Sequence, residues 1–161
     1  MRGPIEGVDP MVAPLFFSFQ QAREDLAGFT EGMTPDQLWA RPFGQNPVGR
    51  EIRHIGGSID RLVTYLEGKA LSDGQLRELS SEFDPGAPRE ELLEELNRQL
   101  ARAEAVVRGI DPKTYGEVRE VGRKKLPTTV IGLIVHIAEH TQRHVGQAIG
   151  VAKLSRATIH P

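Results

Sequence analysis

Apolar side chains recur along this sequence at the three- and four-residue spacing of amphipathic helices in four long segments. The pattern predicts helices over residues 10–31, 47–67, 88–109 and 128–153. The second segment keeps the most regular spacing, and Gly68 follows it as a helix stop signal. The fourth segment carries apolar residues almost all the way round, which predicts a largely buried helix.

Long connectors separate the predicted helices, at residues 32–46, 69–87 and 110–126. In the first connector, Thr34 is placed to cap a short helical turn that reaches Trp39. Helical segments of this length, with no strand pattern between them, favour an all-α fold. We therefore expect a four-helix bundle with long connections, in which functional side chains project inward from facing helices.

The composition fits one globular domain spanning residues 1–161, with 39% hydrophobic and 26% charged residues. The net charge of -2, with one compact basic cluster at 123–125, argues against a nucleic-acid partner. No stretch approaches the ~18 apolar residues of a membrane span. Residues 1–14 lack the apolar core of a signal peptide, so we expect a cytoplasmic protein without a membrane partner.

The sequence contains no cysteine, which excludes disulfides, thiolate metal sites and cysteine nucleophiles. Any metal ion must therefore bind nitrogen or oxygen ligands. The nitrogen ligands available are the histidines, and four of the five lie in predicted helices.

Three histidines, His136, His140 and His144, lie four residues apart on the fourth predicted helix. Because four residues advance a helix by only about 40°, these side chains form one stripe, and neighbouring apolar residues predict apolar surroundings for it. The stripe has two interpretations. The rings are either core histidines hydrogen-bonded to backbone or carboxylate groups, or ligands that direct two nitrogens at one metal ion. The zincin protease pattern is absent, because Thr141 follows His140.

Three further residues could belong to a site near this stripe. His54 lies about 120° from the centre of the second helix's apolar stripe, and it could be a ligand or a structural residue. Arg61 lies on the same side of the second helix as His54, two turns further along, and could bind an anion. An exposed arginine is the simpler interpretation. Gln147 lies one turn beyond His144, within about 20° of the His140 direction, and could support a ligand or face a substrate.

Three stretches, 33–42, 46–61 and 134–147, together carry a pattern that spans nearly the whole chain. The second contains one helical histidine, and the third closes the fourth helix with His-x3-His-x-Gly-Gln. In this order and at this spacing, the stretches resemble the DinB-like (YfiT-like) metalloenzyme family.

By this resemblance the metal ligands are His54, His140 and His144, while His136 matches a family histidine usually not assigned as a ligand. The resemblance implies one divalent metal ion, with zinc or nickel in the first place and iron or copper as alternatives. It also implies a metal-dependent hydrolase, or an S-transferase that uses a low-molecular-weight thiol, acting on a small-molecule substrate. A homodimer is expected, which the surplus apolar surface of the fourth helix also favours. The alternative function is a non-catalytic metal-binding bundle with a stress or regulatory role.

The chain departs from the family pattern around two of the expected ligands. Many members have an aromatic or acidic residue after the second-helix histidine, where Gly56 and Gly57 follow His54 here. Arg143 and Val145 replace a histidine and an arginine in the final motif. Each glycine inside a helix costs roughly 1 kcal/mol relative to alanine. Two of them in succession either admit a neighbouring helix or a substrate, or allow a kink.

Overall fold

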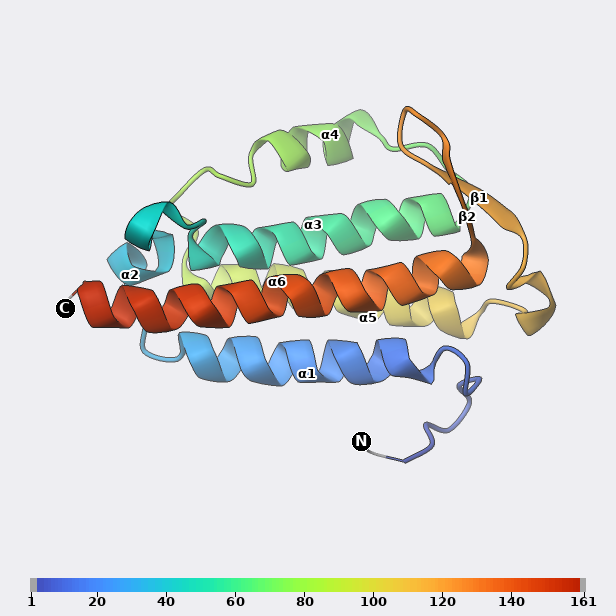
Figure 1. Ribbon diagram of the computed structural model, residues 1–161, viewed down its shortest axis with the longest axis horizontal. Helices are drawn as coiled ribbons and strands as arrows, with labels where there is room; N and C mark the ends of the chain where they lie inside the picture. The colour runs from blue at the N-terminus through green and yellow to red at the C-terminus, as the bar shows by residue number, and fades with distance from the viewer. Residues whose placement is uncertain (1–2, 160–161) are drawn as a thin grey trace.

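Six α-helices and one β-hairpin make up the computed structural model, which describes residues 3–159 (Figure 1). The helices are α1 (Ala13–Thr30), α2 (Pro35–Trp39), α3 (Val48–Leu66), α4 (Asp73–Ser80), α5 (Arg89–Arg108) and α6 (Val130–Thr158), the short 3-10 turns are η1 (Pro42–Gly44) and η2 (Pro112–Thr114), and the strands are β1 (Val118–Val121) and β2 (Leu126–Thr129). The four predicted segments correspond to α1, α3, α5 and α6. His160 lies outside the described residues. No helix within the described range is long and apolar enough to cross a membrane.

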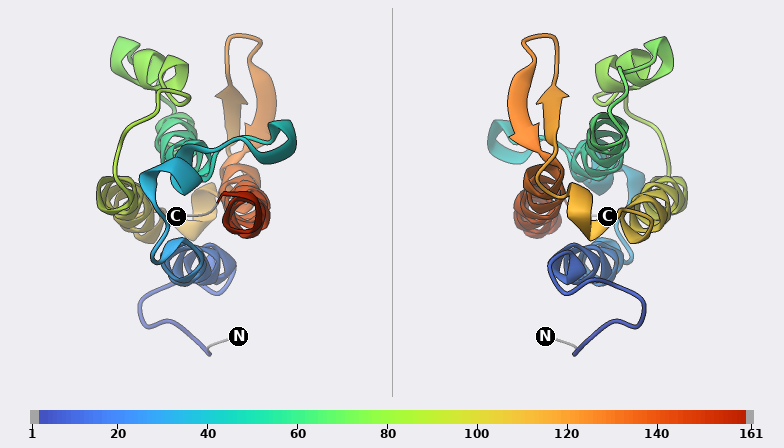
Figure 2. Two further views of the ribbon diagram at one scale, coloured as in Figure 1. Left: turned by 90° about the vertical axis from the view of Figure 1, so that its left-hand side faces the viewer. Right: turned by 90° about the vertical axis from the view of Figure 1, so that its right-hand side faces the viewer.

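The four long helices form a bundle in which two of the three pairs of successive long helices, α1 with α3 and α5 with α6, stand at opposite corners. α6 packs against α1 and α3, and α5 packs against the same two helices. Views along the bundle place α1 opposite α3, and α5 opposite α6 (Figure 2). Each diagonal step must cross the end of the bundle, so the connectors 31–47 and 109–129 have to be long. The predicted all-α bundle with long connections is confirmed.

A single apolar core fills the space between the four helices. Its fully buried members come from each of them: Leu15, Phe19 and Leu26 from α1, Ile52, Ile55 and Ile59 from α3, Leu96 and Leu100 from α5, and Leu133, Ile134 and Ile137 from α6. The regular spacing along α3 gives it a continuous buried face, which packs on α5 and α6 together. This packing holds the middle of α3 beside the middle of α6.

Two of the predicted connectors contain short elements that the apolar pattern does not indicate. A capping box opens α4, because Ser72 and Gln75 each bind the other's backbone N–H through a side-chain oxygen. Within the last connector, β1 and β2 pair antiparallel, with Val121 opposite Leu126 around a four-residue turn. No residue of α4 is buried, which explains why it has no apolar period.

The last helix begins close to its predicted start and ends later than predicted. Its N-cap is Thr129, whose hydroxyl accepts a hydrogen bond from the N–H of Gly132 at 3.1 Å. The helix continues to Thr158, beyond the predicted end at 153. Burial is confined to the sides that face α1 and α3, and Val135 is 57% exposed. The expectation of a helix buried nearly all round is therefore only partly right, and the homodimer stays a prediction.

The bundle core and the α4 segment should respond differently to the same substitution. Replacing the fully buried Leu100 by Ala leaves a cavity between the helices and should lower the free energy of unfolding by about 2–5 kcal/mol. The matched change at Leu79, which is 43% exposed on α4, should alter it by no more than about 0.5 kcal/mol. Urea titration followed by circular dichroism measures both. Equal losses at the two positions would contradict this division between core and periphery.

Candidate metal centre

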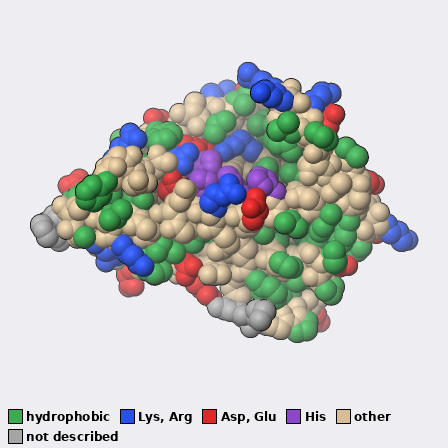
Figure 3. Space-filling model, in the orientation of Figure 1, with side chains coloured by type: hydrophobic (Ala, Val, Ile, Leu, Met, Phe, Trp, Pro, Cys, Tyr) green, Lys and Arg blue, Asp and Glu red, His purple; other side chains and the backbone are tan. Residues whose placement is uncertain are grey.

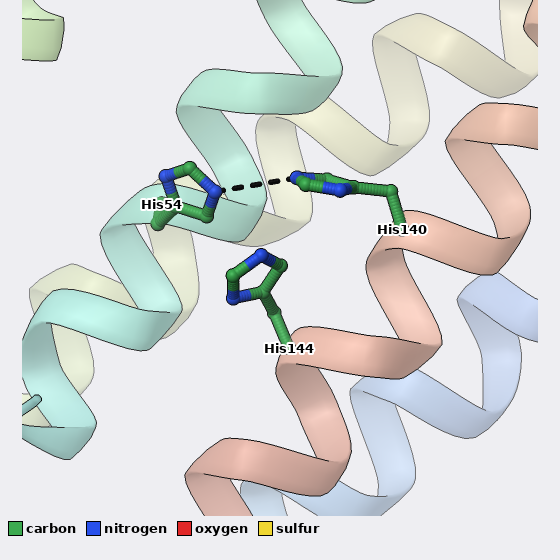
Figure 4. Close-up of side chains that lie close together, drawn as sticks. All are labelled: His54, His140 and His144. Atoms are coloured by element: carbon green, nitrogen blue, oxygen red, sulfur yellow. Dashed lines mark hydrogen bonds between the residues drawn. The ribbon is translucent and has the colours of Figure 1, made fainter. Parts of the chain in front are cut away.

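Three histidines meet where α3 and α6 lie side by side (Figure 4). His54 lies on α3, while His140 and His144 lie one turn apart on α6. One ring nitrogen from each histidine can be chosen so that all three atoms lie within 4.8 Å of one another. The structure thus brings together the three residues that were expected as metal ligands.

The spacing of these nitrogens suits a single metal ion. Nε2 of His54 lies 3.2 Å from Nε2 of His140. Two nitrogens bound at about 2.0–2.1 Å to one tetrahedral zinc ion are about 3.3–3.4 Å apart. The His144 ring centroid lies 4.3 and 4.5 Å from the other two, and one of its nitrogens points into the gap between them (Figure 4).

Two of the rings each have a buried carboxylate on the side away from the other histidines. Nδ1 of His54 lies 2.8 Å from Oε2 of Glu82, and Nδ1 of His144 lies 2.6 Å from Oε2 of Glu51. An ionised carboxylate can only accept hydrogen bonds, so both Nδ1 atoms carry the proton and donate it. In the neutral ring this leaves a lone pair on Nε2, as carboxylate–histidine–metal arrangements require.

The two carboxylates are kept ionised by the groups that donate to them. Burial alone would raise the pKa of Glu51, but hydrogen bonds from His144 and Arg50 outweigh it and lower that pKa below its usual value. The pKa of Glu82 is lowered in the same way, by its histidine and by Arg61. Both carboxylates therefore remain charged at neutral pH.

Two arginines balance the charge of these carboxylates. Arg50 donates to Oε1 of Glu51 at 2.9 Å and lies 3.6 Å from Oε2 of Glu82, while Arg61 donates to Oε1 of Glu82 at 2.8 Å. The Arg61 side chain is only 10% exposed, so the interpretation of this residue as an exposed arginine is wrong. Because each carboxylate has an arginine, charge balance does not require protonated histidines.

The environment of His140 favours its neutral, metal-binding form. Burial is the largest cause that lowers its pKa, and repulsion from His144 and His54 adds to it, giving a value of about 4. An imidazole with this pKa is unprotonated at pH 7. A neutral ring is the form that binds metal ions.

His136 and Gln147 lie at the edges of the cluster. The His136 side chain is 46% exposed, and its Nδ1 lies 2.8 Å from Oε1 of Glu139. The expected apolar surroundings are therefore wrong at this end of the stripe, and His136 is outside the convergent group. Gln147 is exposed and lines a cavity of about 230 Å³ that also includes Glu51 and Asn46.

The cluster is open to solvent on one face of the molecule. Histidine side chains are visible on the face seen in Figure 1, with Lys or Arg and Asp or Glu side chains beside them (Figure 3). The side chains of His54 and His144 are 15% and 12% exposed. Two of the three rings therefore reach the protein surface.

Comparison with known proteins gives the family of the chain. A family model for the DinB superfamily matches residues 18–148. The chain belongs to the DinB superfamily. Among solved structures it is similar to YfiT from Bacillus subtilis, described as a probable metal-dependent hydrolase with an unusual four-helix bundle topology. The TM-score is 0.69 at 16% identity, over 94% of this chain and 92% of that one, which shows a shared fold. A search of curated protein sequences gives no match.

Sequence reasoning missed the carboxylates and Arg50 of this DinB-family chain. Glu51 lies three residues before His54 on α3 and is 1% exposed, so an acidic residue among apolar positions was the available signal. Glu82 follows α4 in the connector, where no period indicates which side chains turn inward. Its partnership with His54 depends on how that connector folds back over α3.

Acid should destabilise the chelator-treated DinB protein. Below its usual pKa of 6.5, His140 takes up a proton in the unfolded chain, whereas its pKa of about 4 keeps the folded ring neutral. The stability from Glu51 and Glu82, whose folded pKa values lie below 4.5, is present above pH 4.5 and lost as pH falls through those values. The free energy of unfolding should therefore fall between pH 6.5 and 4, as measured by urea titration at each pH. His140→Gln should flatten this slope, and stability that rises on acidification would contradict the assignment.

Proposed function

We propose that this protein is a metal-dependent hydrolase of small molecules, with one divalent ion held by His54, His140 and His144. The observation that carries the proposal is the convergence of three imidazole nitrogens within 4.8 Å at a solvent-reachable position. Three protein ligands leave a coordination position for a water molecule or a substrate, as in catalytic zinc sites. The fold shared with YfiT, a probable metal-dependent hydrolase, agrees with this chemistry.

A divalent ion bound by these histidines would supply Lewis-acid chemistry, which activates a water molecule near neutral pH and polarises a carbonyl or phosphoryl oxygen. Nitrogen-only ligation suits zinc or nickel, and also iron or copper. The chain's own residues set the geometry. Glu82 and Glu51 fix the tautomers of His54 and His144, so that both rings direct Nε2 at the same point.

The substrate would lie in the cavity of about 230 Å³ next to α6, which is lined in part by Glu51, the partner of His144. Polar amides line it at Gln45, Asn46 and Gln147, together with the carboxylate of Glu51. Gly146 and Gly150 on the same helix leave space in which an added Cβ would meet nothing within 4 Å. These groups favour a small polar substrate with hydrogen-bonding atoms near the scissile bond.

Metal binding should depend on three of the four helical histidines. His54→Ala, His140→Ala and His144→Ala each remove one of three ligands and should reduce bound metal to near zero after dialysis. His136→Ala should leave most of the metal, because this ring lies outside the convergent group. Elemental analysis by mass spectrometry gives the stoichiometry. Full metal occupancy in both His140→Ala and His144→Ala would refute the ligand set.

Hydrolysis should require the ion. We expect the Zn²⁺- or Ni²⁺-loaded protein to hydrolyse members of a panel of esters, amides and phosphate esters, with activity lost in chelator and restored by metal. His140→Ala is the matched negative control. Turnover that appears only with a low-molecular-weight thiol would replace hydrolysis by S-transfer. A metal-loaded protein inactive in both assays would favour a non-catalytic metal-binding bundle.

A further inference from the structure

We propose that Gly57 is a positioning residue for the metal centre. Its missing side chain leaves the space in which Arg61 reaches Glu82, and Glu82 in turn orients His54. The inference rests on the proposed metal site and adds a residue that belongs neither to the ligand set nor to the lining of the cavity beside α6.

The space above Gly57 is already filled by the guanidinium of Arg61. A Cβ at position 57 would lie 2.8 Å from Nη1 of Arg61 and 3.3 Å from Oε1 of Glu82. Gly57 and Arg61 are four residues apart on α3, so the arginine side chain folds back over the preceding turn. Any residue other than glycine must displace this guanidinium.

Packing, and not a second hydrogen bond, fixes the position of that guanidinium. Nη2 of Arg61 donates to Glu82 at 2.8 Å. Nη1 is buried and has no hydrogen-bond partner among the described residues. A methyl group at position 57 would push on this unanchored nitrogen and move the whole planar group, including the nitrogen that holds Glu82.

The molecule offers the displaced arginine somewhere to go. A cavity of about 330 Å³ is lined by Gly57, Arg61 and Glu82 together with residues of α4, α5 and the intervening connector. The guanidinium can move into this space, so α3 need not bend. Gly57→Ala should therefore spare the fold and loosen Glu82, which leaves Nδ1 of His54 without a fixed acceptor.

The adjacent glycine provides a matched control. A Cβ at Gly56 would lie 3.7 Å from the Cα of Leu96 and from Cγ of Gln99, which is ordinary van der Waals contact. Gly56 thus faces α5 and can be replaced by alanine without a clash, while Gly57 faces Arg61 and Glu82. α3 runs without interruption through both, so neither glycine marks a kink.

The test compares Zn²⁺ affinity, measured by competition with a chromophoric chelator. Gly57→Ala should bind Zn²⁺ about 10- to 100-fold more weakly than the unaltered protein, the range found when a partner of a metal-binding histidine is lost. Gly56→Ala should bind as the unaltered protein does, and circular dichroism checks that both variants are folded. The visible spectrum of bound Co²⁺ should change in Gly57→Ala alone, because it reports ligand geometry.

A double-mutant cycle with Arg61→Ala separates positioning from general destabilisation. If Gly57 acts through Arg61, the double variant should bind Zn²⁺ no more weakly than Arg61→Ala alone. Unchanged affinity in Gly57→Ala, or penalties that simply add, would overturn the inference while leaving the metal site intact. An unaltered protein that binds none of Zn²⁺, Ni²⁺, Fe²⁺ and Cu²⁺ would overturn the proposed function and this inference together.

Discussion

A hydrogen bond to one nitrogen of an imidazole fixes which nitrogen keeps the lone pair, and here two buried carboxylates hold two of the three rings in this way. Glu51 and Glu82 could not stay ionised at 1% and 5% side-chain exposure without compensating donors. Arg50 and Arg61 are those donors. Each carboxylate therefore depends on its arginine and its histidine, since removing one partner of a buried ion pair typically costs about 3–5 kcal/mol. This mutual dependence links the surroundings of the histidines to the stability of the bundle around them.

The diagonal topology explains why the cluster forms between α3 and α6. A simple up-and-down bundle places each helix next to its neighbours in sequence. Here the step from α5 to α6 crosses the bundle, so α6 docks between α1 and α3. The long connectors 31–47 and 109–129 follow from this path, while the separate connector from α3 to α5 carries Glu82 back to His54.

The helices and the histidine stripe could be predicted from the sequence. Side chains whose role depends on how the connectors fold could not. The periodic segments were sufficient for the four long helices, because apolar burial determines them. The pairing of His140 with His144 followed from helix spacing. His54 lies at the edge of its apolar stripe, so only the family resemblance singled it out. Glu82 lies in a segment without a period, and the collision at Gly57 depends on the conformation of one arginine.

Glu82 closely follows a helix that contributes nothing to the apolar core. The α4 helix buries none of its residues, so amide hydrogens in residues 67–81 should exchange through openings that leave the bundle intact. Each such opening would move the Glu82 carboxylate away from His54 while the apolar core stays packed. An ion held by the histidines favours the closed form and slows exchange in this segment by mass action. For a metal ion bound by the histidines, this connector would couple the residence time of the ion to a local opening equilibrium.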